Sequence, residues 1–226
     1  MVEEKPAKKL GRKPNEALKK RRQEQILKAA ALVFAKNGYA GTDVELIASR
    51  LQISKGTIYR YFPSKEELFI ATMEQENQNL REHITREWNQ GDNPETQIEN
   101  AVAGYLSFFH NNPHAVDLLL QERAKFPERG SLSYLSQRDR ALERWGAYLE
   151  KLIEKEVLRP LPVERMVETL ANLIYGAVFL NRIQKDRRGM QDQARDILDV
   201  LVNGLGTDKV RSYFSAQNRK EISEQT

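Results

Sequence analysis

The chain has 226 residues, of which 36 are Lys or Arg and 32 are Asp or Glu, so its formal net charge is +4. It contains no cysteine, which excludes disulfide frameworks, thiolate metal sites and cysteine nucleophiles. The longest nearly apolar run, residues 170–180, is well short of the ~20 residues that a membrane-spanning helix needs. The first residues also lack the apolar core of a secretory signal. These features favour a globular protein and predict a cytoplasmic location.

The charge is unevenly distributed along the chain. Residues 1–65 hold 15 Lys and Arg against 6 Asp and Glu, whereas residues 66–226 hold 21 against 26. A basic first third favours contact with a polyanion, although a solvated basic tail would give the same composition. Residues 1–18, rich in Lys, Arg, Pro and Gly, are predicted to form a disordered basic arm. Whether this arm enters a DNA minor groove is left open.

Two helices are predicted directly after the arm. Apolar residues recur at helical spacing from Lys19, and Asn37-Gly38 marks the end of this first helix. Residues 42–45 (Thr-Asp-Val-Glu) form a capping box, which predicts that Thr42 caps a second helix over residues 43–50.

A third helix is predicted over residues 54–61, with Ser54 as its N-cap. Only residues 51–53 separate it from the second helix, and the two apolar side chains in that turn can hold the helices at a steep angle. This is a helix-turn-helix arrangement, whose second helix enters the DNA major groove.

The rest of the chain is also helical by pattern. A second capping box opens a helix at residues 64–67, and Asn93-Pro94 and Asn112-Pro113 each combine an N-cap with proline at the first helical position. Apolar stripes at helical spacing run through residues 98–109, 115–120, 132–158, 163–183 and 194–205. Because no stretch alternates as a strand does, the sequence predicts an all-α chain of about nine helices.

The residue pattern of the first domain resembles that of a known family. The matching residues are Ile26, Leu27, Ala29, Ala30, Phe34, Gly38, Tyr39, Thr42, Ile47, Ala48, Ile53, Ser54, Gly56, Thr57, Ile58, Tyr59, Tyr61, Phe62, Ser64, Lys65 and Leu68. In this pattern residues 22–69 resemble the DNA-binding domain of the TetR family of transcriptional regulators. Val44 departs from it, since a small polar residue is commoner there. The implied domains are a basic arm (1–18), a helix-turn-helix domain (19–69), a helical ligand-binding and dimerisation domain (70–206) and a polar tail (207–226).

The third helix supplies most of the candidate DNA contacts. Lys55 and Thr57 lie on its leading turn, where they can reach base edges, and Gly56 lets the backbone approach DNA closely. The resemblance implies that Tyr59, Tyr61 and Lys65 contact the DNA backbone. The full set of candidates is Thr42, Ser54, Lys55, Gly56, Thr57, Tyr59, Arg60, Tyr61 and Lys65. An alternative for Tyr59 is packing against the first helix, whereas Ile58 and Phe62 are expected to be core residues.

Residues 170–180 are apolar nearly all round, so that helix must be covered on several faces. The resemblance implies that the last two long helices pair with those of a second copy to form a homodimer. Alternatively, both helices complete the core of one monomer. The candidate interface residues are Ile174, Val178, Ile197, Leu198, Leu201 and Val202.

Aromatic residues gather in the helices that the resemblance places around an effector. The candidate pocket residues are Tyr105, Phe108, Phe109, Tyr134, Trp145, Tyr148, Tyr175 and Phe179. A large apolar cavity with a few polar groups binds hydrophobic or amphipathic small molecules, although the same rings would also build a core.

No motif points to an enzyme. The three histidines lack the Glu-x-x-His pairs of helical di-iron proteins, and neither a phosphate-binding glycine loop nor a nucleophile elbow is present. We therefore expect no catalysis, metal, cofactor or membrane contact. The resemblance implies a dimeric repressor that binds a palindromic DNA operator and is released by a small hydrophobic or amphipathic effector. The alternative is a chromosome-organising or adaptor protein on the same scaffold, without an effector.

Overall fold

The computed structural model describes residues 16–126, 145–183, 190–205 and 208. Its labelled helices are α1 (Glu16–Gly41), α2 (Val44–Leu51), α3 (Lys55–Tyr61), α4 (Lys65–Trp88), α5 (Pro94–Asn111), α6 (Pro113–Lys125), α8 (Val163–Ile183) and α9 (Met190–Leu205). Residues 145–154 add a further helical stretch, and the described residues form no β-strand. The predicted all-α architecture of about nine helices is confirmed.

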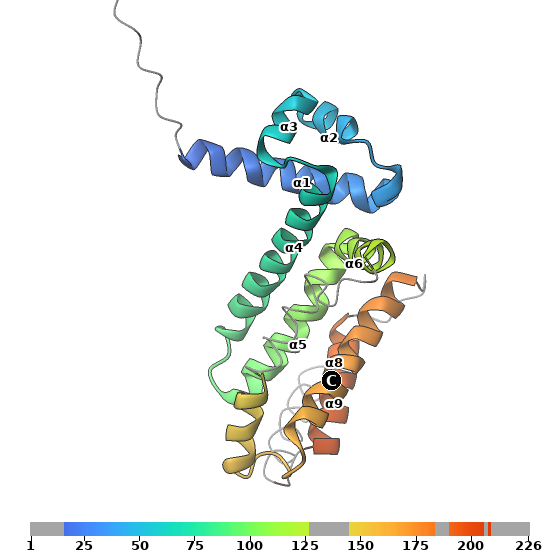
Figure 1. The fold of residues 1–226 in the computed structure, drawn as a ribbon. Helices are drawn as coiled ribbons and strands as arrows, with labels where there is room; N and C mark the ends of the chain where they lie inside the picture. Colours follow the sequence, from blue (N-terminus) through green and yellow to red (C-terminus); the bar gives the residue numbers. More distant parts are fainter. Residues whose placement is uncertain (1–15, 127–144, 184–189, 206–207, 209–226) are drawn as a thin grey trace, which may run out of the picture.

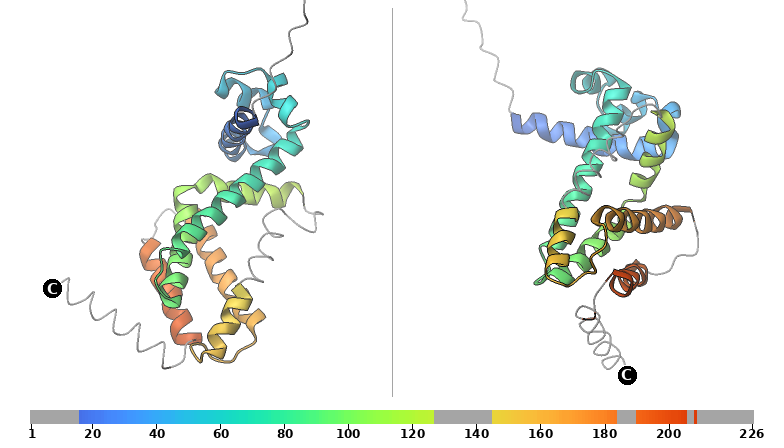
Figure 2. Two further views of the ribbon diagram at one scale, coloured as in Figure 1. Left: turned by 90° about the vertical axis from the view of Figure 1, so that its left-hand side faces the viewer. Right: turned by 60° about the horizontal axis from the view of Figure 1, so that its bottom comes forward.

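Figure 1 shows two parts that share one long helix. The head consists of α1, α2, α3 and residues 65–73 of α4, and the body contains the described residues from 74 onward. Helix α4 leaves the head and runs down the body beside α5, while α6 lies directly beneath the head and contacts α1. Helices α8 and α9 lie on the other side of α5, as the turned views of Figure 2 also show.

Local sequence signals fix most helix ends. Ser54 and Ser64 cap α3 and α4 as predicted, since each side chain accepts a hydrogen bond from the backbone N–H three residues later. Asn93 caps α5, with Thr96 completing a capping box. Asn112 behaves differently from the prediction, because its Nδ2 donates to the carbonyl of Phe108 at 2.9 Å, and it makes no side-chain cap to α6.

Helix α1 begins earlier than predicted and is interrupted at its predicted stop. It begins at Glu16, so residues 16–18 of the expected arm are helical, whereas residues 1–15 lie outside the described residues. At the other end Gly38 has φ 76°, a left-handed backbone that favours glycine, and this interrupts the helix where Asn37-Gly38 predicts a stop.

The N-cap of α2 differs from the predicted one. Asp43, and not Thr42, is the N-cap: its carboxylate accepts from the N–H of Glu45, at 2.9 Å. The Thr42 hydroxyl donates instead to the carbonyl of Gly38 at 2.7 Å, inside the head. The predicted capping box therefore does not form around Thr42.

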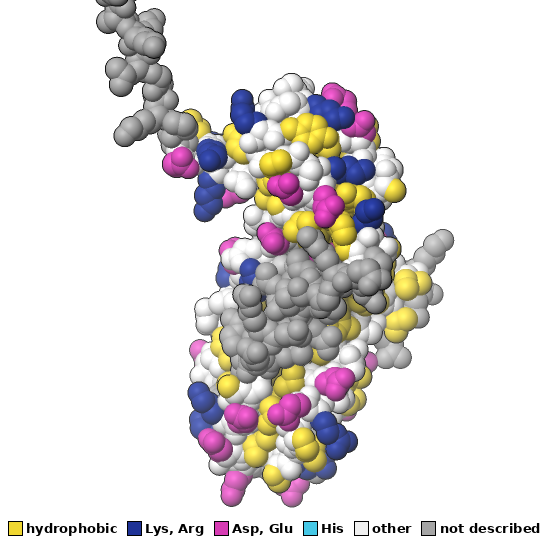
Figure 3. Space-filling view, viewed as in Figure 1, with side chains coloured by type: hydrophobic (Ala, Val, Ile, Leu, Met, Phe, Trp, Pro, Cys, Tyr) yellow, Lys and Arg dark blue, Asp and Glu magenta, His cyan; other side chains and the backbone are white. Residues whose placement is uncertain are grey.

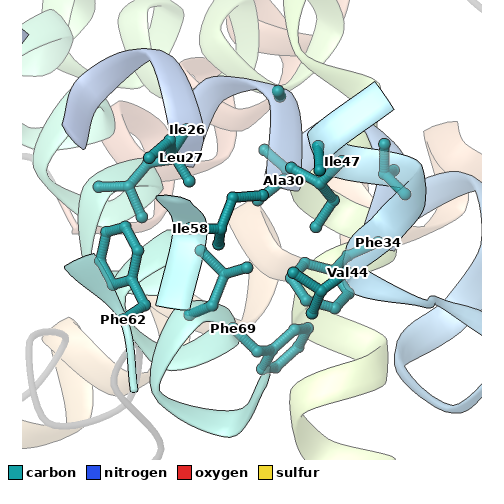
Figure 4. Close-up of a cluster of buried hydrophobic side chains, with 14 of the residues drawn as sticks. Ile26, Leu27, Ala30, Phe34, Val44, Ile47, Ile58, Phe62 and Phe69 are labelled. Atoms are coloured by element: carbon teal, nitrogen blue, oxygen red, sulfur yellow. The ribbon is translucent and has the colours of Figure 1, made fainter. Parts of the chain in front are cut away.

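The head is built on one apolar cluster. Figure 4 shows Ile58 of α3 in its middle, among side chains from α1, α2 and α4. Ile58 and Phe62 are buried, which confirms that they are core residues. Leu118 also belongs to this cluster and is fully buried, although it comes from α6. The head core is therefore completed by a helix of the body.

The body core buries part of the predicted dimer interface. Val178, Ile197 and Leu198 are buried within a cluster that joins α4, α5, α6, α8 and α9, and Ile174 packs against it. The side chains of Leu201 and Val202 are outside the described residues. The described candidates thus pack within their own monomer, whereas the roles of Leu201 and Val202 stay predictions.

Candidate nucleic-acid interface

The turn between α2 and α3 has the geometry of a helix-turn-helix corner. Gln52 ends α2 in a left-handed conformation, with φ 53°, and its N–H donates to the carbonyls of Ala48 and Ser49. The N–H of Ile53 then donates to the carbonyl of Ala48 at 3.0 Å. These bonds use the last carbonyls of α2, so the chain turns within three residues and starts α3 at a fixed angle.

Helix α3 buries one side and exposes the other. Ile58 is fully buried, while Tyr59 is 38% exposed and Arg60 is also exposed. The accessible side of Tyr59 thus remains available for DNA contact. Tyr61 is half-buried against the head core, with the Arg60 guanidinium 5.7 Å from its ring centroid.

The leading turn of α3 brings four predicted residues together. The Ser54 hydroxyl accepts from the N–H of Thr57 at 3.2 Å and lies 2.9 Å from the Thr57 hydroxyl. At Gly56 a side chain would find only Ser54 Oγ, 3.9 Å away, so the chain itself does not require glycine there. The exposed backbone at this point is accessible to a ligand that approaches closely.

Lys55 has a partner that the sequence patterns did not reveal. Its Nζ lies 2.7 Å from Oδ1 of Asp43, the N-cap of α2. The hydrogen bonds from the N–H of Glu45 and from Lys55 lower the pKa of Asp43, and the same carboxylate raises the pKa of Lys55. Asp43 is twelve residues away, so only the assembled corner places it beside α3.

The polar groups of the Thr42 and Lys65 side chains are hydrogen-bonded within the head. The Thr42 side chain is only 2% exposed, and its hydroxyl is bonded to Gly38. The Lys65 ammonium donates to the carbonyl of Thr42 at 2.8 Å and sits 4.7 Å from the centroid of the Tyr39 ring. The Lys65 side chain therefore holds the turn after α1 against the start of α4, while the Thr42 hydroxyl closes the turn itself. Figure 3 shows cationic and anionic side chains interspersed over one face of the head.

The body contains a small hollow between α5, α6 and α8. Its cavity volume is about 20 Å³, which is room for about one water molecule. It is lined by Leu106, Phe109, His110, Pro113, Val116, Val178, Asn181 and Arg182. Among the predicted pocket residues that the structure describes, only Phe109 lines it. Arg182 is held by Asp117 through two contacts of 2.8 Å, which raises the pKa of the guanidinium.

The other predicted pocket aromatics pack against one another or against the body core. Trp145 and Tyr148 pack with Trp88 at the far end of α4, with ring centroids 5.3 and 5.0 Å from that of Trp88. Tyr105 lies between Phe109 and Tyr175, Phe108 packs edge-on against Phe109, and Phe179 packs on the body core. Tyr134 is outside the described residues.

Helices α8 and α9 also expose apolar side chains to solvent. We call the surface formed by Leu173, Leu180, Ile183 and Val200 the outer face. Its exposed fractions are 39% for Leu173, 52% for Leu180, 74% for Ile183 and 56% for Val200. Gly176, between Leu173 and Leu180, has no described atom within 4 Å of the position that a side chain would take. A further helix could approach α8 closely at this point.

Two negative findings apply to the residues that the structure describes. They hold no group of three or more His, Asp or Glu residues placed to bind a metal ion. None of their helices combines the length and apolar character needed to span a membrane.

Comparison with known proteins gives matches to both parts. Residues 26–72 match the family model of bacterial regulatory proteins, tetR family. The HTH-type transcriptional repressor NicS of Pseudomonas putida is 33% identical over 110 residues, which cover 45% of this chain and 48% of NicS. The nucleoid occlusion factor SlmA of Glaesserella parasuis is 29% identical over 135 residues, 54% of this chain and 67% of SlmA. The match thus spans about half the length of NicS.

Solved structures share the fold over more of the chain. A TetR-like transcriptional regulator from Rhodococcus sp. RHA1 has 27% identity and a TM-score of 0.62, covering 80% of this chain and 92% of its own. The regulator FadR from Bacillus subtilis, in complex with stearoyl-CoA, has 20% identity and a TM-score of 0.68, covering 80% and 98%. Residues 26–72 thus match the DNA-binding domain of tetR-family regulatory proteins, and the described helices share the fold of TetR-like regulators.

Proposed function

We propose that the chain is a transcriptional repressor that binds a palindromic DNA operator as a homodimer through α3. The observation that carries this proposal is the two-sided α3: Ile58 anchors the helix in the head core, while Lys55, Thr57, Tyr59 and Arg60 lie on its accessible sides. A helix held in this way can enter a major groove without losing its packing. The similarity to NicS, a repressor, supports the sign of regulation.

The homodimer is proposed through the outer face of α8 and α9. Leu173, Leu180 and Ile183 follow one another at spacings of seven and three residues, so they lie on one side of α8. Exposed apolar residues gathered on neighbouring helices mark a protein interaction surface. A second copy would bury the same residues from both partners, as a two-fold interface requires.

The proposed effector is a small hydrophobic or amphipathic molecule bound in the body. The hollow between α5, α6 and α8 would have to widen to admit such a molecule, and it offers an apolar floor with polar groups from His110, Asn181 and Arg182. The fold neighbour FadR was solved with stearoyl-CoA, an amphipathic ligand. A ligand that prefers one arrangement of α6 would shift the head, because α6 contributes Leu118 to the head core.

The DNA-binding proposal is tested by selection from a random duplex library, followed by fluorescence anisotropy on selected and scrambled duplexes at a fixed salt concentration. Selected sequences should share a palindrome with half-sites about 10 bp apart, or a multiple of that distance. The selected duplex should bind about 1,000-fold or more tightly than the scrambled one. Absence of any enriched sequence would contradict a repressor.

A second candidate is favoured by the similarity to SlmA, a nucleoid occlusion factor: a DNA-binding protein without a small-molecule effector. The discriminating measurement adds stearoyl-CoA and smaller amphiphiles to the complex with the selected duplex. Release of DNA by a compound that also raises the melting temperature supports an effector-controlled repressor. Sequence-specific binding that none of these compounds weakens supports the second candidate.

A further inference from the structure

The ion pair between Lys55 and Asp43 lies at the start of the proposed DNA-reading helix. Lys55 is the first residue of α3 and Asp43 is the N-cap of α2, and their side chains are 38% and 61% exposed. The pair therefore sits on the surface where the two helices meet. Neither residue belongs to the apolar core that holds the corner together.

The geometry fixes the Asp43 carboxylate more firmly than an ordinary surface carboxylate. Its Oδ1 accepts both the N–H of Glu45 at 2.9 Å and the Lys55 ammonium at 2.7 Å. The first bond is the cap of α2, so the carboxylate stays with the backbone while the flexible lysine comes to it. The direction of Lys55 is thus set by α2.

Such pairing has different consequences for the two kinds of DNA contact. Non-specific binding depends on cations that neutralise phosphates and release counterions, and a lysine already neutralised by a carboxylate contributes less to it. A lysine ammonium has three donors, and the Asp43 contact uses one of them. The remaining donors can still reach acceptors on base edges, such as O6 and N7 of guanine.

We propose that Asp43 is a positioning residue for operator selection, which holds the Lys55 ammonium for base-edge contact and withholds it from phosphates. This inference rests on the proposed DNA-binding function. It assigns selectivity to an acidic side chain that itself makes no attractive contact with DNA. Removing the carboxylate should therefore strengthen binding to DNA in general and weaken discrimination.

The main variant is Asp43→Asn, since asparagine caps helices as well as aspartate does and α2 should remain folded. The probes are the duplex selected by the wild-type protein and a random-sequence duplex of the same length. Binding to the random duplex should tighten about 3- to 10-fold, and its log K against log salt slope should steepen by about 1. The ratio of selected to random affinity should fall.

The matched control is Glu45→Gln, which removes a carboxylate from the same first turn of α2 without removing the Lys55 contact. Glu45→Gln should leave the ratio of selected-duplex to random-duplex affinity near its wild-type value. A second control is a double-mutant cycle with Lys55→Met. If Asp43 acts through Lys55, Asp43→Asn should no longer steepen the salt slope in the Lys55→Met background.

Three results would overturn the inference. An unchanged ratio in a correctly folded Asp43→Asn protein would show that Asp43 does not set selectivity. An equal effect of Asp43→Asn with and without Lys55 would show that the carboxylate only repels phosphates. If the wild-type protein bound no duplex at all, the proposed function would fail as well, so the wild-type measurement separates the two failures.

Discussion

Tyr59 and Ile58 are adjacent in the sequence but face opposite environments. Ile58 is fully buried in the head core, whereas Tyr59 is 38% exposed on the free side of α3. Tyr59→Ala should therefore weaken binding to many DNA sequences while changing the free energy of unfolding by no more than about 0.5 kcal/mol. Fluorescence anisotropy and urea denaturation measure the two effects on the same protein.

Ile58→Ala provides the opposite pattern as a control. Removing its buried side chain should cost about 2–5 kcal/mol of stability, because the head core cannot close over the cavity. A Tyr59→Ala protein that unfolds as readily as Ile58→Ala would show that the ring supports the fold. Unchanged DNA affinity in a stable Tyr59→Ala protein would remove Tyr59 from the interface.

The distance along the chain between a residue and its partner decides whether the role of that residue can be predicted from the sequence. Ser54 could be assigned as a cap because its partner, the N–H of Thr57, is only three residues away. Lys65 could not be placed, since its ammonium reaches the carbonyl of Thr42, 23 residues earlier in the chain. The Lys55–Asp43 pair was missed for the same reason: it exists only once α2 and α3 have met at their corner.

At the scale of helices, α8 shows what periodicity leaves undecided. Its pattern correctly indicates apolar residues on several faces, but it does not say which face the monomer itself covers. The structure buries Val178 inside and leaves Leu180 outside, two residues apart. Periodicity alone therefore does not separate residues of the monomer core from residues of an interface.

The outer face can be tested with Leu180→Glu. A charge at this exposed site should separate the proposed dimer into monomers while preserving the helical fold, because the buried cluster is untouched. Light scattering gives the oligomeric state and circular dichroism the fold. Val178→Glu is the contrasting variant and should unfold the body, since it buries a charge. A folded Leu180→Glu dimer would place the interface elsewhere.

Most helix ends, by contrast, could be predicted because their signals are local. Capping side chains at Ser54, Ser64 and Asn93 each act within three residues, and a proline follows the cap of α5. The expected domain boundary at residue 69 is harder to place from sequence. It falls within α4, a single helix that belongs to both head and body.

For the whole molecule, the most informative contact is between α6 and the head. Leu118 is fully buried in the head cluster, Leu119 packs against both clusters, and Gln121 donates to the carbonyl of Phe34 at 3.0 Å. Head and body therefore share apolar surface. We expect Leu118→Ala to lower the stability of the head by about 2–5 kcal/mol although the residue lies in a body helix.

Differential scanning calorimetry measures this coupling directly. The wild-type protein should unfold in one cooperative transition that Leu118→Ala shifts as a whole. Leu120→Ala is the matched control, because Leu120 lies on the same helix and is 49% exposed. This variant should shift the unfolding transition little. Two separate transitions, with the head's unaffected by Leu118→Ala, would contradict a shared core.

The contribution of α6 to the head also limits how such regulators can be recombined. A chimera that joins residues 16–69 to a different helical body would lose the side chains of Leu118 and Phe126, and Phe69 and Tyr39 would face a partner of the wrong shape. A transplanted head must therefore travel with its facing surface on α6, or that surface must be redesigned. The unit of exchange is a three-dimensional contact surface, and no single cut in the chain isolates it.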